Sequence, residues 1–103
     1  MCSFSNAWKL NREGMAACNE GDFDKAEDSL LEAIRLASCK SRKIHRATMF
    51  NNLSVIYQMS GRINDAVQAY SSAISYLNPE HKGQAALIAR MKGKLESLKD
   101  IAA

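Results

Sequence analysis

Apolar residues recur along this chain at the three- and four-residue spacing of helices that bury one face. One stripe follows Gly21 and consists of Phe23, Ala26, Leu30, Ala33, Ile34 and Ala37. Another follows Gly61 and consists of Ile63, Ala66, Tyr70, Ala73, Ile74 and Leu77. A further apolar run precedes each glycine, and glycine readily adopts the left-handed conformation that ends a helix. The pattern therefore predicts two helical hairpins with elbows at Gly21 and Gly61.

The two hairpins are copies of one sequence unit, offset by 40 residues. Gly-Asp-Phe-Asp-Lys-Ala at 21–26 corresponds to Gly-Arg-Ile-Asn-Asp-Ala at 61–66. The match continues at Ala33 and Ala73. Self-similarity at a fixed period is the signature of repeat architectures. We expect the first alanine of each copy where the two helices of a hairpin come closest, and Ala33 and Ala73 where the next unit packs, because bulkier residues would overpack these crossings.

A last apolar pattern follows the only proline, Pro79. Apolar residues between Ala85 and Ile101 keep helical spacing, and lysines and an arginine lie between them. This pattern predicts a helix over 81–101. We expect that helix to cover the open side of the second hairpin, because the end of a stacked helical array needs a polar outer face.

These features resemble the tetratricopeptide repeat family. The residues that carry the resemblance in the first copy are Leu10, Gly14, Ala17, Gly21, Phe23, Ala26, Leu30 and Ala33. Those in the second copy are Phe50, Leu53, Tyr57, Gly61, Ile63, Ala66, Tyr70, Ala73 and Pro79. The resemblance implies an all-α fold, in which antiparallel helical hairpins stack as a short right-handed α-solenoid of about five helices. The structural repeat signature consists of Gly21, Ala26, Ala33, Gly61, Ala66, Tyr70 and Ala73.

In this register the chain is a single domain over residues 1–103. Repeat 1 covers 7–40, repeat 2 covers 47–80, and a capping helix covers 81–101. The offset between the copies exceeds the roughly 34 residues of a common tetratricopeptide unit by about six residues. These extra residues fall around 38–46, and we interpret them as an extended second helix of repeat 1 or as a longer basic turn between the repeats.

The resemblance implies a binding function. In this family the first helices of successive repeats line a concave groove that holds an extended peptide or a partner helix. The corresponding residues are Trp8, Asn11, Arg12, Met15 and Asn19 from repeat 1, Thr48, Asn51, Asn52, Val55 and Met59 from repeat 2, and Lys82, Ala86 and Ala89 from the last helix. Asparagine amides can pair with a peptide backbone, and methionines offer an adaptable apolar floor. Trp8 and Met15 fit core positions equally well.

One subfamily grips the C-terminal carboxylate of heat-shock chaperones with a clamp of lysines, asparagines and an arginine. Asn52 and Lys82 occupy clamp-like positions. However, lysine, asparagine and arginine would be expected at the positions of Asn11, Met15 and Ala86. The clamp is incomplete, so we do not expect this chain to bind chaperone tails.

Motifs for catalysis are absent from the sequence. It contains no Gly-x-Ser-x-Gly elbow, no glycine loop that cradles phosphate and no His-Glu-x-x-His pair. His45 and His81 are isolated among polar or charged neighbours, and we interpret both as solvated. We predict a non-enzymatic adaptor without cofactor or metal, whose partner is a protein or a peptide.

Composition and the N-terminus bear on location. The longest aliphatic run, 85–89, is far shorter than the roughly 20 residues that span a bilayer. The N-terminus has neither the basic start nor the apolar run of a signal peptide, and three widely spaced cysteines fit reduced thiols. We predict no membrane span and a cytoplasmic location.

Length and charge leave other functions open. About three repeats are usually needed for independent stability, so a chain with two repeats and a cap could self-associate as a homo-oligomeric scaffold. Acids dominate 13–32 and bases dominate 35–46, an arrangement that complements helix dipoles. A lower alternative is that the basic turn at 40–46 contacts nucleic acid.

A competing fold fits part of the chain. Residues 47–101 resemble the small three-helix domains of microtubule-interacting and trafficking proteins, which would bind a helical partner between their helices. This alternative leaves the match between the two sequence copies unexplained.

Overall fold

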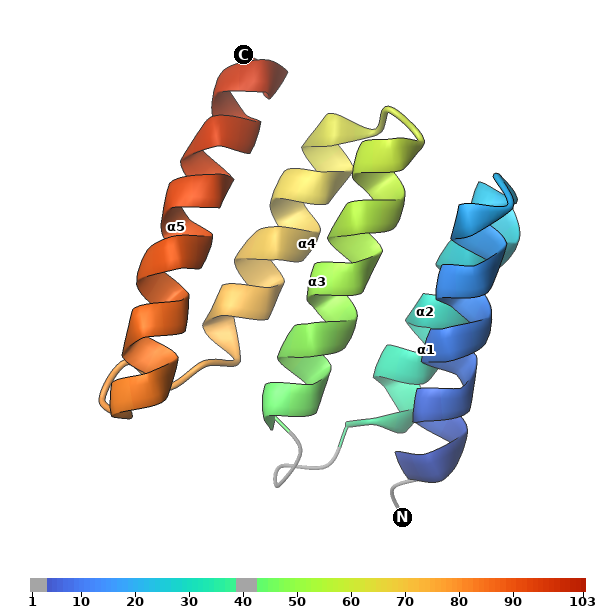
Figure 1. The fold of residues 1–103 in the computed structure, drawn as a ribbon, viewed down its shortest axis with the longest axis horizontal. Helices are drawn as coiled ribbons and strands as arrows, with labels where there is room; N and C mark the ends of the chain where they lie inside the picture. The colour runs from blue at the N-terminus through green and yellow to red at the C-terminus, as the bar shows by residue number, and fades with distance from the viewer. Residues whose placement is uncertain (1–3, 39–42) are drawn as a thin grey trace.

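The computed structural model describes residues 4–38 and 43–103. In these ranges the chain forms no strand and five helices, which are α1 (Phe4–Asn19), α2 (Phe23–Leu36), α3 (Lys43–Met59), α4 (Ile63–Ser75) and α5 (Lys82–Ala102). The α1/α2 hairpin, the α3/α4 hairpin and α5 stand side by side in that order (Figure 1), in a layer of 33 × 29 × 16 Å. The predicted all-α fold of stacked helical hairpins is confirmed.

The two elbows are built in the same way around Gly21 and Gly61, whose φ angles are 83° and 81°. After α1, the Gly21 amide donates to the Cys18 carbonyl (3.0 Å), and the next amide donates to the Ala17 carbonyl (2.9 Å). Equivalent bonds of 3.2 and 2.8 Å follow α3. Such a pair of bonds needs a left-handed residue, which glycine supplies without steric cost. Asp22 then caps the start of α2 with its side chain.

Inside each hairpin the two helices approach closely at one small residue. A β-carbon added to Gly14 of α1 would overlap the Leu30 side chain of α2 and lie 3.1 Å from the Ala26 carbonyl oxygen. At the equivalent point of the second hairpin, the buried hydroxyl of Ser54 donates to the Ala66 carbonyl oxygen (3.0 Å). The serine fits because its hydroxyl bonds to a backbone oxygen that an apolar group would only crowd.

Two apolar clusters fill the space between the helices. The first lies mainly among α1, α2 and α3, with Leu30, Met49 and Ile56 fully buried. In the second, Ile88, Met91, Leu95 and Leu98 of α5 pack against Tyr70, Ala73 and Leu77 of the second hairpin. The exposed residues of α5 include Lys92, Glu96, Lys99 and Asp100. α5 therefore covers the second hairpin with a polar outer side, and its bounds lie within one residue of those predicted.

The extended second helix predicted for repeat 1 is not present. α2 ends at Leu36 with Ala37 as its cap residue, and α3 begins at Lys43, seven positions after Leu36. The same interval separates α4 from α5. The apolar stripe of α2 stops at Ala37, and Ser38 is already exposed, so further helical turns would bury nothing. The rest of the predicted insertion, 39–42, lies outside the described residues.

A polar cluster joins the two hairpins. The Tyr57 hydroxyl of α3 donates to the Glu27 carboxylate of α2. Arg62 also donates to Glu27 (3.0 Å), and its guanidinium lies 4.6 Å from the centre of the Tyr57 ring. A further bond joins Arg62 to Asp65 (2.8 Å). The hydrogen bond from Tyr57, with help from Arg62, lowers the pKa of Glu27, whereas burial and that same bond raise the pKa of Tyr57.

The close approach at Gly14 predicts opposite effects of one substitution at two glycines. Gly14→Ala should lower the free energy of unfolding by about 1–3 kcal/mol, because the new methyl group overpacks the helix crossing. Gly93→Ala should raise it by up to about 1 kcal/mol, because a β-carbon there meets nothing within 4 Å and alanine favours the helix. Urea denaturation followed by circular dichroism measures both. Shifts of the same sign would contradict the proposed crossing.

The polar cluster predicts a pH-dependent contribution from Glu27. A carboxyl group with a lowered pKa stabilises the folded state above its usual pKa of 4.5, and that stabilisation is lost as the pH falls through the lower folded-state value. The loss of unfolding free energy in Glu27→Gln should therefore be largest at neutral pH and shrink below pH 4.5. Asp28→Asn, an exposed neighbour, controls for the change of charge. A loss that is independent of pH would refute this role.

Candidate binding groove

α1 and α3 run parallel and touch along their length. Near the start of both helices, the rings of Trp8 and His45 meet edge to face with centroids 5.5 Å apart. Near the ends, the Cys18 thiol lies 3.5 Å from the Met59 sulfur. The start of α1 contacts the start of α3, and the end of α1 contacts the end of α3. The first helices of the two hairpins therefore point the same way. Burial raises the pKa of the Cys18 thiol, which keeps it protonated and weakly reactive.

Between these contacts, two predicted groove residues bond to each other. The Asn52 amide donates to the Asn11 side-chain oxygen at 3.0 Å. Asn11 is only 6% exposed, and Asn52 is half-buried. This pair joins α1 to α3, and it commits one donor and one acceptor that an extended peptide would otherwise use.

The remaining predicted groove residues of α1 divide into two kinds. Trp8 and Met15 are half-buried and pack against the first apolar cluster. Arg12 and Asn19 are exposed. Trp8 and Met15 therefore pack partly into the core, as one of the two interpretations expected, and their assignment to the groove stays a prediction.

Four predicted residues of α3 remain accessible. Thr48 is exposed, Asn51 and Val55 are half-buried, and the Met59 side chain is 55% exposed. Lys82, the first residue of α5, is also exposed. This surface offers hydrogen-bonding groups beside apolar ones, which is the chemistry that a peptide backbone and its side chains require.

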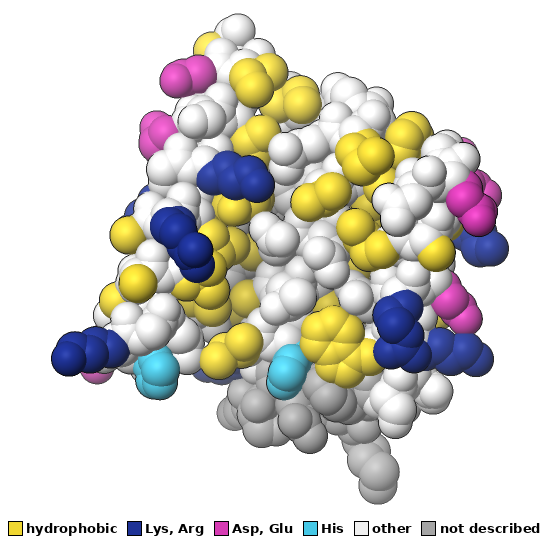
Figure 2. Space-filling view, in the orientation of Figure 1, with side chains coloured by type: hydrophobic (Ala, Val, Ile, Leu, Met, Phe, Trp, Pro, Cys, Tyr) yellow, Lys and Arg dark blue, Asp and Glu magenta, His cyan; other side chains and the backbone are white. Residues whose placement is uncertain are grey.

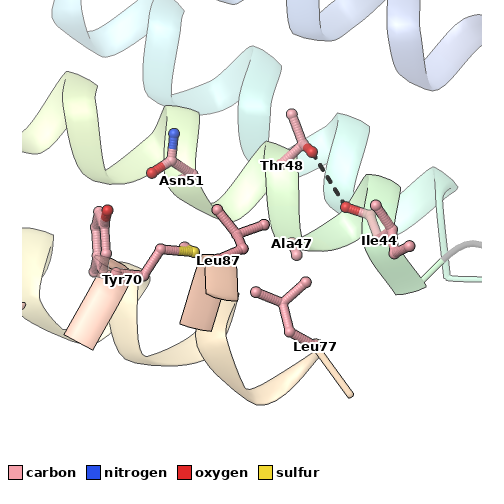
Figure 3. A pocket seen from close by; sticks show the side chains of 8 residues that line it. Ile44, Ala47, Thr48, Asn51, Tyr70, Leu77 and Leu87 are labelled. Atoms are coloured by element: carbon pink, nitrogen blue, oxygen red, sulfur yellow. Dashed lines mark hydrogen bonds between the residues drawn. The ribbon is translucent and has the colours of Figure 1, made fainter. Parts of the chain in front are cut away.

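In the described residues, the backbones of α3 and α5 stand apart from each other. Within the described ranges no Cα atom of α3 lies within 8 Å of one in α5, and a pocket of about 190 Å³ lies between the two helices. It is lined by Ile44, Ala47, Thr48 and Asn51 of α3, Tyr70 and Leu77 below them, and Leu87 and Met91 of α5 (Figure 3). The Thr48 hydroxyl is turned to the Ile44 carbonyl, to which it donates (3.2 Å). We call this cavity the α3/α5 pocket.

Of the residues that line the pocket, only Thr48 and Asn51 were predicted from the sequence as groove residues. A signal for two others was present, since Ile44 and Ala47 share one helical face with Thr48 and Asn51 at spacings of three and four residues. The contribution of Leu87 carried no such signal, because it depends on how far α5 stands from α3.

The prediction of a solvated histidine is wrong for His45. It is half-buried and packs against Trp8, because the parallel alignment of α1 and α3 brings together two rings that are distant in sequence. His81 is exposed and precedes the first turn of α5 as its N-terminal cap residue.

Arg46 is not part of an open basic turn. Its guanidinium donates to the Ile34 carbonyl (3.3 Å) and the Tyr76 hydroxyl (2.8 Å), and it lies 4.9 Å from the centre of the Tyr76 ring. Arg46 thus ties α3 to the end of α2 and to the residue after α4. Of the other bases in the predicted nucleic-acid turn, Lys40 and Arg42 lie outside the described residues.

Neither a metal site nor a membrane span occurs in the described part of the chain. Across residues 4–38 and 43–103, no three side chains of His, Cys, Asp or Glu gather as metal ligands. In the same ranges no helix has both the length and the apolar character needed to cross a membrane.

The asparagine pair predicts an asymmetric response to alanine substitution. Asn52→Ala leaves the buried oxygen of Asn11 without its donor, which should cost about 1–3 kcal/mol. Asn11→Ala should cost less, because the half-buried amide of Asn52 can turn to water. Urea denaturation of both variants and of the double variant gives their coupling energy. Strictly additive losses would mean that the hydrogen bond contributes nothing.

Comparisons with known proteins agree with this geometry. The family model of the tetratricopeptide repeat matches residues 5–78, which include both hairpins. Photosystem I assembly protein Ycf3 of Prochlorococcus marinus subsp. pastoris is 32% identical over 68 residues, 66% of this chain and 38% of that protein. The same protein from another Prochlorococcus marinus strain is 32% identical over 74 residues, 72% of this chain and 40% of that protein. This chain thus spans about two fifths of the length of these curated relatives. With two matching hairpins and a family match over most of its length, the chain belongs to the tetratricopeptide repeat family.

Proposed function

We propose that this chain is a non-enzymatic interaction module that binds an extended peptide or a helix of a partner protein in the groove lined by α1, α3 and α5. One observation carries the proposal: α1 and α3 are aligned in parallel, and accessible polar and apolar side chains remain beside their shared seam. Members of this family are protein–protein interaction modules.

The accessible groups suit a protein ligand. Asn51 presents an amide on α3, and Met59 adds an exposed, adaptable apolar surface. The Thr48 hydroxyl donates to the Ile44 carbonyl, and its oxygen can still accept a hydrogen bond. Arg12 supplies a positive charge at the α1 side. A partner segment would gain apolar contacts at the methionine and backbone hydrogen bonds along α3.

The named activity of the relatives supports a protein partner. They are photosystem I assembly proteins, and a protein that assembles a multi-subunit complex acts on other proteins. We carry over to this chain only that class of partner, in the cytoplasmic location predicted from the sequence.

Self-association is the competing proposal. The polar outer side of α5 disfavours stacking through that end, because exposed charged residues such as Lys92 and Asp100 would lose water. The groove could still be filled by a second copy. Native mass spectrometry over a dilution series separates the two, since a stable monomer at low concentration favours binding to a different protein.

The groove proposal predicts that exposed residues of the first helices govern partner capture. In affinity purification from cells that express the protein, Arg12→Glu combined with Met59→Glu should lose the bound partners. Both side chains are exposed. Only the contact between Cys18 and Met59 is lost from the α1/α3 seam, while the Asn52–Asn11 bond and the ring contact remain, so circular dichroism should report a retained helical fold. The loss of partners is expected because the substitutions reverse one charge and place another on the apolar floor.

A matched pair on α2 provides the control. Lys25→Glu combined with Leu31→Glu makes the same kinds of change at exposed positions, and the Leu31 side chain is 46% exposed. This variant should capture the same partners as the unaltered protein. If both pairs behave alike, the groove is not the binding surface.

A further inference from the structure

The α3/α5 pocket is suited to one large apolar side chain. Its lining is mainly apolar, and Ile44 at its edge is 48% exposed. A cavity of roughly 150 Å³ lined by apolar side chains already admits benzene, and this pocket has a volume of about 190 Å³. An aromatic ring or a branched aliphatic side chain therefore fits, and its burial would remove both the guest and Ile44 from water.

The residues that line the pocket are uncharged. The charged residues of α3, and those of α5 up to Leu95, are all basic, and Glu80 precedes α5. Arg90 and Lys94 are exposed and share one side of α5 with the pocket residues Leu87 and Met91, at spacings of three and four residues. Tyr70 lines the pocket, and burial raises the pKa of its hydroxyl. Arg90 lies close enough for its positive charge to oppose this rise.

The surface view agrees with this arrangement. Figure 2 shows dark-blue side chains on α5 beside a yellow patch that lies along that helix, whereas the magenta side chains lie toward the margins of the face. A segment entering the pocket from this face therefore meets cations beside the apolar opening. Charge complementarity at such a rim selects partners and speeds their association.

We propose that the α3/α5 pocket, with Arg90 and Lys94 at its rim, holds one bulky apolar side chain of a partner-protein segment whose neighbouring residues are acidic. This inference rests on the proposed function and adds to it the position and chemistry of the anchor. The apolar side chain contributes most of the affinity, and the carboxylates restrict which segments bind.

A second copy of this chain is the competing occupant. Its exposed Leu31 on α2 lies beside Asp28 and Glu32. However, Glu32 is already bonded to Arg35 of the same helix, so this surface offers less free negative charge. The chain's exposed Ile101 lies beside Asp100, but Lys99 adjoins that acid, so this end of α5 also lacks a cluster of free acids. We therefore assign the pocket to a different protein.

Selection from a phage-displayed library of random peptides tests the inference. The unaltered protein should enrich peptides with a Phe, Trp, Leu, Ile or Met next to Asp or Glu. Synthetic fluorescent copies of these peptides are then measured by anisotropy. Thr48→Phe, which fills the mouth of the pocket at an exposed position, should weaken binding by about tenfold or more. Ser71→Phe, an exposed change on α4 outside the pocket, should not.

Charge variants test the rim separately. Arg90→Glu combined with Lys94→Glu should weaken the same peptides by about tenfold, and the difference should diminish at high salt. Lys92→Glu combined with Lys99→Glu makes the same change of net charge elsewhere on α5 and should bind as the unaltered protein does. Equal effects of the two pairs would overturn the rim assignment.

The outcomes separate this inference from the proposed function. Selected peptides that ignore Thr48→Phe but are lost with Arg12→Glu combined with Met59→Glu would overturn the pocket and leave the groove standing. Failure to enrich any peptide would count against both the pocket inference and the groove proposal. A dimer in sedimentation that dissociates with either Thr48→Phe or Leu31→Lys would assign the pocket to a second copy and refute the inference.

Discussion

The close packing of two helices within each hairpin is the constraint on which the rest of this structure depends. At Gly14 the backbone of α1 lies so near α2 that a methyl group would overlap Leu30. At the matching point of the second hairpin, Ser54 keeps the spacing by bonding to the Ala66 carbonyl oxygen. Two hairpins of the same shape can stack with their first helices parallel, and the proposed groove follows from that stacking.

The two halves of the proposed groove differ because different contacts set the spacing between neighbouring helices. α1 and α3 are held together directly by ring, sulfur and asparagine contacts, of which the bond between Asn52 and Asn11 is partly buried. α5 instead rests on α4 through Ile88 and Met91, and in the described part of the chain its backbone stays apart from that of α3. The first half therefore offers a closed surface and the second a pocket.

The features predicted well from sequence are those determined by local conformation and residue size. Gly21 and Gly61 had to be elbows because their positions end apolar stripes and demand a positive φ. Contacts between distant segments were harder to predict, since His45 meets Trp8 of the other hairpin and Arg46 reaches Tyr76, 30 positions away. The α3/α5 pocket was missed for the same reason. Its width depends on where α5 packs on α4. The spacing of apolar residues within α3 or α5 does not predict that position.

The central claim is that a partner occupies the face shared by α1, α3 and α5. Nuclear magnetic resonance of methyl-labelled methionines tests it most directly, because Met59 is exposed in the groove, Met91 lines the pocket and Met49 is fully buried. Adding a selected peptide should shift the Met59 and Met91 signals and leave Met49 nearly unchanged. Unchanged Met59 and Met91 signals, with the peptide bound, would place the partner on another surface and contradict the account.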